Sequence, residues 1–274
     1  MTDTASPFHG IPRRRVGSLG FTVLPLSAAI DLVVHLGSTQ PTEGIAIHFA
    51  NAYNVALADT DQQYQALMAS GDLVFTDGTP VVWAGRKLHP DVAEAWTRVY
   101  GPDLMTGILD RSLDAQATAM DAHASANNPR HYLLGGTPEV LATLQQRISE
   151  LWPNALIVGA DSPPFATPTP ADLDARDERI RASGATLVWV GLGTPKQDVE
   201  VRRLADSLPV TALAVGAAFD FLAGTTKQAP VWMQRSGLEW SFRLAQEPRR
   251  LARRYLWGNP RFVLTVARQR TGRA

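Results

Sequence analysis

The segment WVGLGTPKQD, residues 189–198, has the composition of a turn that binds phosphorylated ligands. Its glycine-rich part begins directly after the apolar run TLVWV, and Gly191 and Gly193 would let the backbone approach a pyrophosphate closely. Free N–H groups at the start of the next helix would add positive partial charge. Lys196 stands where a dinucleotide fingerprint has its third glycine, which disfavours hydride transfer and favours a phosphate-and-sugar ligand. An ordinary strand-to-helix connection has similar residues, so the turn alone leaves both interpretations open.

Other polar and glycine residues follow apolar runs of strand length. Asn51 follows GIAIHFA, Asp77 follows DLVFT, Gly135 and Gly136 end RHYLLGG, and Asp220 lies in VTALAVGAAFDF. The carboxyl ends of parallel strands share one edge of a sheet, and ligands bind at that edge. We therefore expect these residues to lie along one edge together with the glycines of the 189–198 turn.

The order of these runs predicts the fold class. Apolar runs that end in turn residues alternate with segments of helical period, which indicates βαβ units. We predict an α/β fold: a Rossmann-like, mainly parallel sheet flanked by helices, with a basic helical C-terminal appendage. The predicted strands lie within residues 44–51, 72–78, 130–136, 154–160, 186–193 and 210–221, and the clearest helical segments are 54–70, 137–152 and 195–208.

The length and composition predict one α/β domain with a small appendage, because 274 residues with 45% hydrophobic content can bury one sizeable core. We expect a disordered N-terminal segment at 1–15, the main domain at 16–229 and the appendage at 230–274. Three arginines at 13–15 precede a partly apolar stretch that imitates a signal peptide, but polar residues interrupt it, so a short β segment and a helix start explain it better. No apolar run approaches the roughly 20 residues that span a bilayer.

The charge is distributed unevenly although the formal net charge is zero. Residues 230–274 contain ten arginines and two glutamates but no lysine or aspartate, so the remainder of the chain is acidic overall. This asymmetry predicts a tail that faces an anionic partner. The chain has no cysteine, which excludes disulfides, thiolate metal sites and cysteine nucleophiles, and fits a reducing compartment.

A metal site is not expected. Asp59, Thr60 and Asp61 form a D-x-D pattern, which holds a divalent ion in other sugar transferases, but it lies inside a segment of helical period rather than at a strand end. We interpret it as a solvated helix face. The six histidines show no paired spacing typical of metal ligands and stand at positions 9, 35, 48, 89, 123 and 131.

Eight ordered motifs between about Val16 and Tyr255 resemble the WecG/TagA/CpsF glycosyltransferases (glycosyltransferase family 26). They are FANAYN, FTDGTPVVWAGR, RVYGPDL, YLLGGTPEVL, VGLGTPKQD, VGAAFDFLAG, APVWMQRSGLEWSFRL and EPRRLARRY. The resemblance implies transfer of N-acetylmannosamine, its uronic acid or glucose from a UDP donor to a polyprenyl-pyrophosphate-linked saccharide during surface polysaccharide synthesis. It also implies inversion at the anomeric carbon, no metal or other cofactor, and a C-terminal appendage that docks on the membrane.

Two residues take catalytic roles from this resemblance. Asp77 matches the aspartate of the family's DG motif, which implies that Asp77 is the base that removes the proton of the acceptor hydroxyl. The alternative is an aspartate that only forms the turn before Gly78. One residue can serve both roles. Arg98, in RVYGPDL, matches an arginine beside the active site, where a guanidinium would hold the pyrophosphate; a surface arginine is the alternative. Asp103 in the same motif is a candidate acceptor-binding residue.

The remaining implied contacts concern the donor and the acceptor. Asn51 matches the acceptor-side asparagine of the family's T-x-N motif, although Phe49 replaces its threonine. Phe165 is the candidate for stacking on uracil, because DSPPFATP lacks the tyrosine that some relatives have there. Gln197 matches the glutamine of GxPKQE, with Asp198 in place of glutamate. The implied donor-binding residues are Gly135, Gly136, Gly191, Gly193, Gln197 and Asp220.

The tail is the third implied site. Arginines alternate with aromatic residues from Trp232 onward, a pattern that suits a membrane interface. Arg249, Arg250, Arg253 and Arg254, in EPRRLARRY, are the candidates for contact with the membrane or with pyrophosphate. The resemblance places the protein on the cytoplasmic face of the cell membrane and disfavours nucleic acid as the tail's partner.

Two other classes of function stay open. Basic and aromatic residues together also bind nucleic acid, so a non-catalytic sugar-nucleotide or dinucleotide binding protein with a nucleic-acid-binding tail is the main alternative. A plain amphipathic helix packed on the core would account for part of the tail pattern as well. An NAD-dependent oxidoreductase is disfavoured by the missing third glycine.

Overall fold

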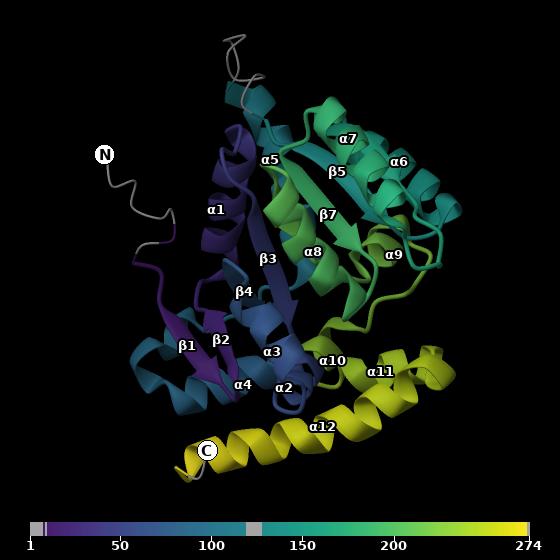
Figure 1. The fold of residues 1–274 in the computed structure, drawn as a ribbon. Coiled ribbons are helices and arrows are strands. Elements are labelled where there is room, and N and C mark those ends of the chain that lie inside the picture. The colour runs from purple at the N-terminus through teal and green to yellow at the C-terminus, as the bar shows by residue number, and fades with distance from the viewer. Residues whose placement is uncertain (1–7, 9, 119–127, 273–274) are drawn as a thin grey trace.

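A six-stranded parallel sheet forms the centre of the molecule, as the alternating pattern predicts (Figure 1). The computed structural model describes residues 8, 10–118 and 128–272. The strand order in the sheet is β4-β3-β8-β7-β5-β6, and every pair is parallel. The strands are β3 (Ile45–Ala50), β4 (Leu73–Thr76), β5 (Arg130–Gly135), β6 (Leu156–Asp161), β7 (Leu187–Gly191) and β8 (Thr211–Leu213).

Helices cover both faces of the sheet, because the strands alternate apolar residues toward each side. In β7, Leu187 and Trp189 belong to one buried cluster, whereas Val188 and Val190 belong to another. The first cluster is completed by helices α1 (Leu26–Ser38), α5 (Gly101–Thr118), α6 (Pro138–Leu151) and α9 (Ala218–Ala223). The second is completed by α7 (Pro170–Ser183) and α8 (Lys196–Ser207). This is the Rossmann-like α/β architecture expected from the sequence.

A third cluster surrounds an antiparallel hairpin of β1 (Arg13–Val16) and β2 (Leu19–Thr22). Helices α2 (Ala52–Ala58), α3 (Gln62–Ala69) and α4 (Thr79–Leu88) contribute to it, as does Trp96, which follows the 3-10 helix η1 (Pro90–Ala95). Arg13 begins β1, so the segment expected to be disordered through residue 15 includes a paired strand from residue 13; residues 1–7 and 9 lie outside the described part of the chain.

The C-terminal segment is helical and lies across the carboxyl ends of the strands. It contains α10 (Val231–Arg235), α11 (Glu239–Gln246) and α12 (Pro248–Arg270). Figure 1 shows the arrowheads of β3 and β7 pointing toward these helices. The long helix α12 packs along α2, where Tyr53 lies 3.0 Å from the position a Cβ of Gly258 would take. The segment therefore covers the edge at which the polar strand-end residues collect.

Two predicted segments differ from the structure. The helical segment 54–70 is two helices, because Asp61 ends the first pattern by capping α3: its carboxylate accepts from the Gln63 and Tyr64 amides. The D-x-D pattern therefore lies in the turn between α2 and α3, not inside a helix. The run 210–221 is a three-residue strand followed by α9, so Asp220 lies on a helix rather than at a strand end.

Close approach of β5 and β7 requires glycine at the end of β5. Gly135 has φ +125°, and a Cβ there would lie 2.5 Å from the Gly191 carbonyl oxygen. We expect Gly135→Ala to lower the free energy of unfolding by about 3 kcal/mol, because positive-φ strain and a backbone clash add. Denaturant unfolding measures this difference.

Gly193→Ala is the matched control for that substitution. Gly193 also has positive φ, at +76°, but no heavy atom lies within 4 Å of its added Cβ. Only strain of about 1–2 kcal/mol is then expected. Equal losses for the two variants would contradict the claim that strand approach, rather than turn conformation, requires Gly135.

Candidate active site

Asp77 lies at the carboxyl end of β4, where its backbone continues the sheet pairing. Its N–H donates to the Ala50 carbonyl at 2.9 Å, and Gly78 follows with φ +114°, a conformation that favours glycine. Asn51 follows the end of the adjacent strand β3; its side-chain oxygen caps α2, and its Nδ2 lies 3.4 Å from Asp77 Oδ2. The DG motif thus bends the chain so that the aspartate projects from the sheet edge beside Asn51.

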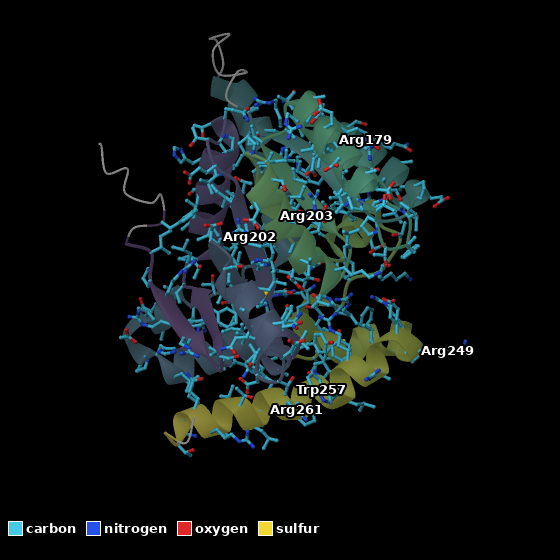
Figure 2. All side chains as sticks on the ribbon, in the orientation of Figure 1. Arg179, Arg202, Arg203, Arg249, Trp257 and Arg261 are labelled. Carbon is cyan, nitrogen blue, oxygen red and sulfur yellow. The ribbon has the colours of Figure 1, made fainter. Side chains whose placement is uncertain are left out.

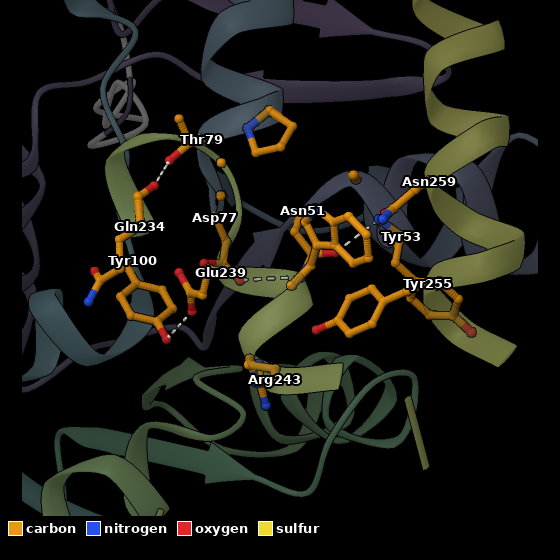
Figure 3. A pocket seen from close by; sticks show the side chains of 15 residues that line it. Asn51, Tyr53, Asp77, Thr79, Tyr100, Gln234, Glu239, Arg243, Tyr255 and Asn259 are labelled. Carbon is orange, nitrogen blue, oxygen red and sulfur yellow. Dashed lines mark hydrogen bonds between the residues drawn. The ribbon is translucent and has the colours of Figure 1, made fainter. Parts of the chain in front are cut away.

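A pocket opens around this aspartate, between the main domain and the C-terminal helices (Figure 3). One wall comes from the ends of β3 and β4 and the starts of α2 and α4. The other wall comes from α10, α11 and α12. The lining residues are Asn51, Ala52, Tyr53, Asp77, Gly78, Thr79, Pro80, Tyr100, Gln234, Gly237, Glu239, Trp240, Arg243, Tyr255 and Asn259.

Arg98 joins the two walls. Its guanidinium donates to Glu239 Oε2 at 2.8 Å and to Gln234 Oε1 at 2.9 Å, and it lies 3.8 Å from the centre of the Tyr100 ring. The Tyr100 hydroxyl donates to the other Glu239 oxygen at 2.9 Å. Thr79 adds a bond from its hydroxyl to the Gln234 carbonyl at 2.7 Å. In this structure, therefore, the guanidinium binds side chains of the C-terminal segment and holds that segment over the pocket.

The surroundings of Asp77 make it a weaker acid than a free aspartate. Burial raises the pKa of its carboxyl to about 6; the Arg98 charge opposes this rise and the Glu239 charge adds to it. The hydrogen bond from Asn51 also lowers the pKa. A carboxyl group with a pKa near 6 is mostly ionised at neutral pH yet more basic than an ordinary aspartate, which suits a general base.

Two more arginines, one lining the pocket and one stacked on the lining residue Tyr53, have no anionic partner among the described residues. Arg243 lines the pocket and lies 5.5 Å from the centre of the Phe221 ring. Arg254 stacks 4.5 Å from the centre of the Tyr53 ring, and its buried Nε has no hydrogen-bond acceptor in the described part of the chain. Burial lowers the pKa of Arg254. Guanidinium groups without a carboxylate partner beside a pocket are suited to a phosphate or diphosphate ligand.

The predicted donor-binding glycines gather at a second place on the same sheet edge. Gly136 N donates to the Gly191 carbonyl at 3.3 Å, so the ends of β5 and β7 touch. Gly136 has φ +72° and precedes the Thr137 cap of α6. No heavy atom lies within 4 Å of a Cβ added to Gly193, so the turn after β7 has open space beside it.

Gln197 binds the protein itself rather than facing solvent. Its Oε1 accepts from the Gly193 amide at 3.0 Å and its Nε2 donates to the Ala214 carbonyl at 3.0 Å. The side chain is only 5% exposed. The solvent-facing alternative is therefore wrong, because the amide ties the turn after β7 to the end of β8.

Asp220 and Asp103, the two remaining predicted carboxylates, both lie on helices. Asp220 is on α9, and burial followed by the Glu247 charge raises the pKa of its carboxyl. Asp103 is exposed in the first turn of α5, and partial burial of its carboxyl raises its pKa despite the Arg98 charge. Neither carboxylate lines the pocket around Asp77. Phe165, in the loop after β6, is 91% exposed.

The four arginines of EPRRLARRY differ in their surroundings. Arg249 and Arg253 are exposed and have no anionic partner among the described residues. Arg250 binds Glu247 with both Nε and Nη2, and Arg254 turns inward toward Tyr53. Figure 2 shows Arg249, Trp257 and Arg261 along α12. No helix in the described part of the chain is both long and apolar enough to cross a bilayer.

The sequence motifs contain several pocket residues whose roles the sequence did not indicate. Tyr100 is part of RVYGPDL, Gln234 and Glu239 are part of APVWMQRSGLEWSFRL, and Tyr255 ends EPRRLARRY. Nothing in their local spacing distinguishes them from surface residues. Among the described residues, no group of three or more His, Cys, Asp or Glu side chains is arranged to hold a metal ion.

The fold and the pocket define a class: an α/β protein with a carboxylate and several arginines at the ligand-binding edge of a Rossmann-like sheet. The sequence profile of the Glycosyl transferase WecG/TagA/CpsF family matches residues 14–274. The chain belongs to this family of glycosyltransferases of cell-surface polysaccharide biosynthesis, which confirms the resemblance of the eight motifs.

The raised pKa of Asp77 predicts a pH-dependent change in stability. The folded state holds this proton more tightly than the unfolded chain, whose aspartate has its ordinary pKa of 3.8. The ionised carboxylate therefore destabilises the fold above pH 6, and this cost disappears as the pH falls toward 4. We expect Asp77→Asn to be more stable than wild type at pH 8, by at most about 3 kcal/mol, in denaturant unfolding at pH 8, 6 and 4.

Asp174→Asn is the control, because Asp174 is an exposed aspartate on α7. Its effect on stability should be small and similar at the three pH values. A difference between Asp77→Asn and wild type that does not vary with pH would contradict the raised pKa.

Proposed function

We propose that this protein is an inverting, metal-independent glycosyltransferase. It moves a sugar of the N-acetylmannosamine type, its uronic acid or glucose from a UDP donor to a polyprenyl-pyrophosphate-linked saccharide at the cytoplasmic face of the cell membrane. The observation that carries the proposal is the pocket in which Asp77, a weaker acid than an ordinary aspartate, lies with Arg243, which has no anionic partner among the described residues. Family membership supports the transferase class.

In the proposed reaction, Asp77 accepts the proton of the acceptor hydroxyl as its oxygen attacks the anomeric carbon. The new bond forms on the face opposite the bond to UDP, so the configuration inverts as the carbon–oxygen bond to the diphosphate breaks. Negative charge then accumulates on the UDP leaving group. Arginine side chains offset that charge, which lowers the barrier to its departure.

The cationic groups divide between two roles in this scheme. Arg98 holds Glu239 and Gln234, and its positive charge favours the ionised form of Asp77. Arg243 and Arg254 have no carboxylate partner among the described residues, so they are the groups free to bind a diphosphate. The turns at Gly136 and Gly193, which precede α6 and α8, are the proposed place for the nucleotide, because the positive ends of the two helices suit an anion; the Gly136 and Gly193 amides themselves donate within the protein.

The membrane part of the proposal rests on the outer face of α12. Leu256, Val263 and Leu264 are exposed by 71%, 64% and 54%. Exposed arginines accompany them at Arg249 and Arg253. Apolar residues flanked by arginines on one helix face are typical of helices that lie in a membrane interface. Nucleic acid does not require such apolar exposure, so this face favours a membrane as the partner.

We expect acceptor-dependent release of UDP from one donor in a panel of UDP-sugars, with a short-chain polyprenyl-pyrophosphate-GlcNAc as acceptor. The rate should be the same in EDTA and should fall at least 100-fold in Asp77→Asn, because proton transfer to a positioned base contributes that much or more. Asp174→Asn is the matched control. Full activity of Asp77→Asn would contradict the role of Asp77 as the base.

We also expect Leu256→Glu with Val263→Glu to weaken binding to anionic vesicles at least tenfold, because two apolar contacts are replaced by repelled charges. Vesicle co-sedimentation at two salt concentrations measures this. The matched control is Leu151→Glu with Val199→Glu, a leucine and a valine exposed by 51% and 54% on α6 and α8. Equal loss in both pairs, or binding to DNA without preference for vesicles, would contradict docking through α12.

A further inference from the structure

A line of buried polar side chains leads from α8 to the start of α2, beside Asp77. Asp198 is fully buried, and Tyr64 is 4% exposed. The Tyr64 hydroxyl donates to Asp198 Oδ2 at 3.1 Å, and Asn54 Nδ2 donates to the Tyr64 oxygen at 2.6 Å. Asn54 is also fully buried, and its Oδ1 accepts from the Asn51 backbone N–H at 3.1 Å. The line therefore ends at the residue that contacts Asp77.

The hydrogen bonds of this line run in one direction. The Tyr64 hydroxyl donates to the Asp198 carboxylate oxygen, which accepts. The Tyr64 oxygen is then the acceptor for the Asn54 amide nitrogen, and this leaves the Asn54 carbonyl facing the Asn51 N–H. Asn51 in turn points its Nδ2 at Asp77. The Asn54 amide orientation thus depends on groups buried behind the pocket. The Asn51 side chain is oriented by its own Oδ1, which accepts from the Tyr53 N–H at 3.0 Å, and Asn54 completes this capping box by binding the Asn51 backbone.

Asp198 has no arginine or lysine partner within the described residues. His48, fully buried on β3, lies 3.3 Å away through Nδ1, and its Nε2 has no hydrogen-bond partner in the described structure. A buried carboxylate whose side-chain partners are a hydroxyl and an imidazole, with no guanidinium or ammonium, is costly to desolvate. Its place in the first turn of α8 favours a negative charge, and its Oδ2 in addition fixes the Tyr64 hydroxyl from which the line continues.

We propose that Asp198 and Tyr64 are positioning residues for Asp77, which act through Asn54 to orient Asn51 and the start of α2 beside the reacting carboxylate. The effect on catalysis rests on the proposed transferase function; the effect on Asp77 itself does not. Without the Tyr64 hydroxyl, the Asn54 amide loses its acceptor, and the capping box that holds Asn51 at the start of α2 is weakened. The hydrogen bond that Asn51 provides to the ionised Asp77 weakens as a result.

The test compares Tyr64→Phe with Tyr132→Phe. Tyr132 is a β5 tyrosine that is 3% exposed, so both variants remove one hydroxyl from a buried ring. The first readout is the pH titration of the Asp77 carboxyl by carbon-13 NMR, assigned by its absence in Asp77→Asn. The second is kcat and KM in the transfer assay. Asp198→Asn provides a second variant of the line.

In Tyr64→Phe we expect the pKa of Asp77 to rise by roughly half a unit, because a hydrogen bond to its charged form is weakened. The other groups that act on Asp77, which are Arg98, Glu239, Arg243 and Arg254, remain in place. We expect kcat to fall about tenfold while KM for the donor changes less than twofold. Tyr132→Phe should change neither the titration nor kcat.

An Asp77 titration that is the same in Tyr64→Phe, Asp198→Asn and wild type would overturn the positioning role. Equal changes in Tyr64→Phe and Tyr132→Phe would overturn it as well, because a general loss of packing would then explain them. A shifted titration in a protein that transfers no sugar would uphold the positioning role and count against the transferase function. The experiment therefore distinguishes failure of the positioning role from failure of the proposed transferase function.

Discussion

The ion pair between Arg98 and Glu239 is the contact on which the pocket depends. It joins residues 141 positions apart in the chain, and the two side chains are 16% and 20% exposed. Tyr100 donates to the same carboxylate, so both of its oxygens are bound. Loss of either partner would leave a mostly buried charge without compensation, which is strongly unfavourable. Helices α10 and α11 are thereby held against the sheet edge, and the pocket has its second wall.

The same ion pair shapes the chemistry of Asp77. Arg98 lowers the pKa of that carboxyl and Glu239 raises it, so the two partners act in opposite directions on one group. Burial by the pocket walls is the largest influence and leaves the pKa at about 6. The C-terminal helices therefore do more than cover the site, because they bring both the Glu239 carboxylate and Arg243 close to Asp77.

The sequence predicted the sheet well because parallel strands buried on both faces leave apolar runs that end in turn residues. It did less well where local pattern was ambiguous. The run 210–221 is mostly apolar, and the turn at Gly216, with φ +59°, lies between β8 and α9. The segment 54–70 keeps a helical period across the Asp61 cap that divides it.

The residues at strand ends were predictable as site candidates, whereas the residues of the C-terminal helices that lie against them were not. Asn51 and Asp77 follow adjacent strands, so the topology alone brings them together. Glu239 reaches the site only because a distant helix docks there, and no spacing within its motif indicates this. Gln197 stands at a helix start that local pattern marks as exposed, yet the turn after β7 folds back over it.

The position of α12 relates the pocket to the exposed apolar face under the proposed membrane docking. Successive residues of a helix are separated by about 100° around its axis, so Tyr255 and Asn259, which line the pocket, lie about 40° apart. Leu256 lies only about 60° beyond Asn259 and begins the exposed face. The pocket wall and the exposed face are therefore neighbouring sides of one helix rather than opposite sides. In the proposed arrangement, the membrane with the lipid-linked acceptor lies against the exposed face. The saccharide of that acceptor would have to pass only the edge of α12 to reach Asp77. The diphosphate between lipid and saccharide would remain near the arginines of the same helix.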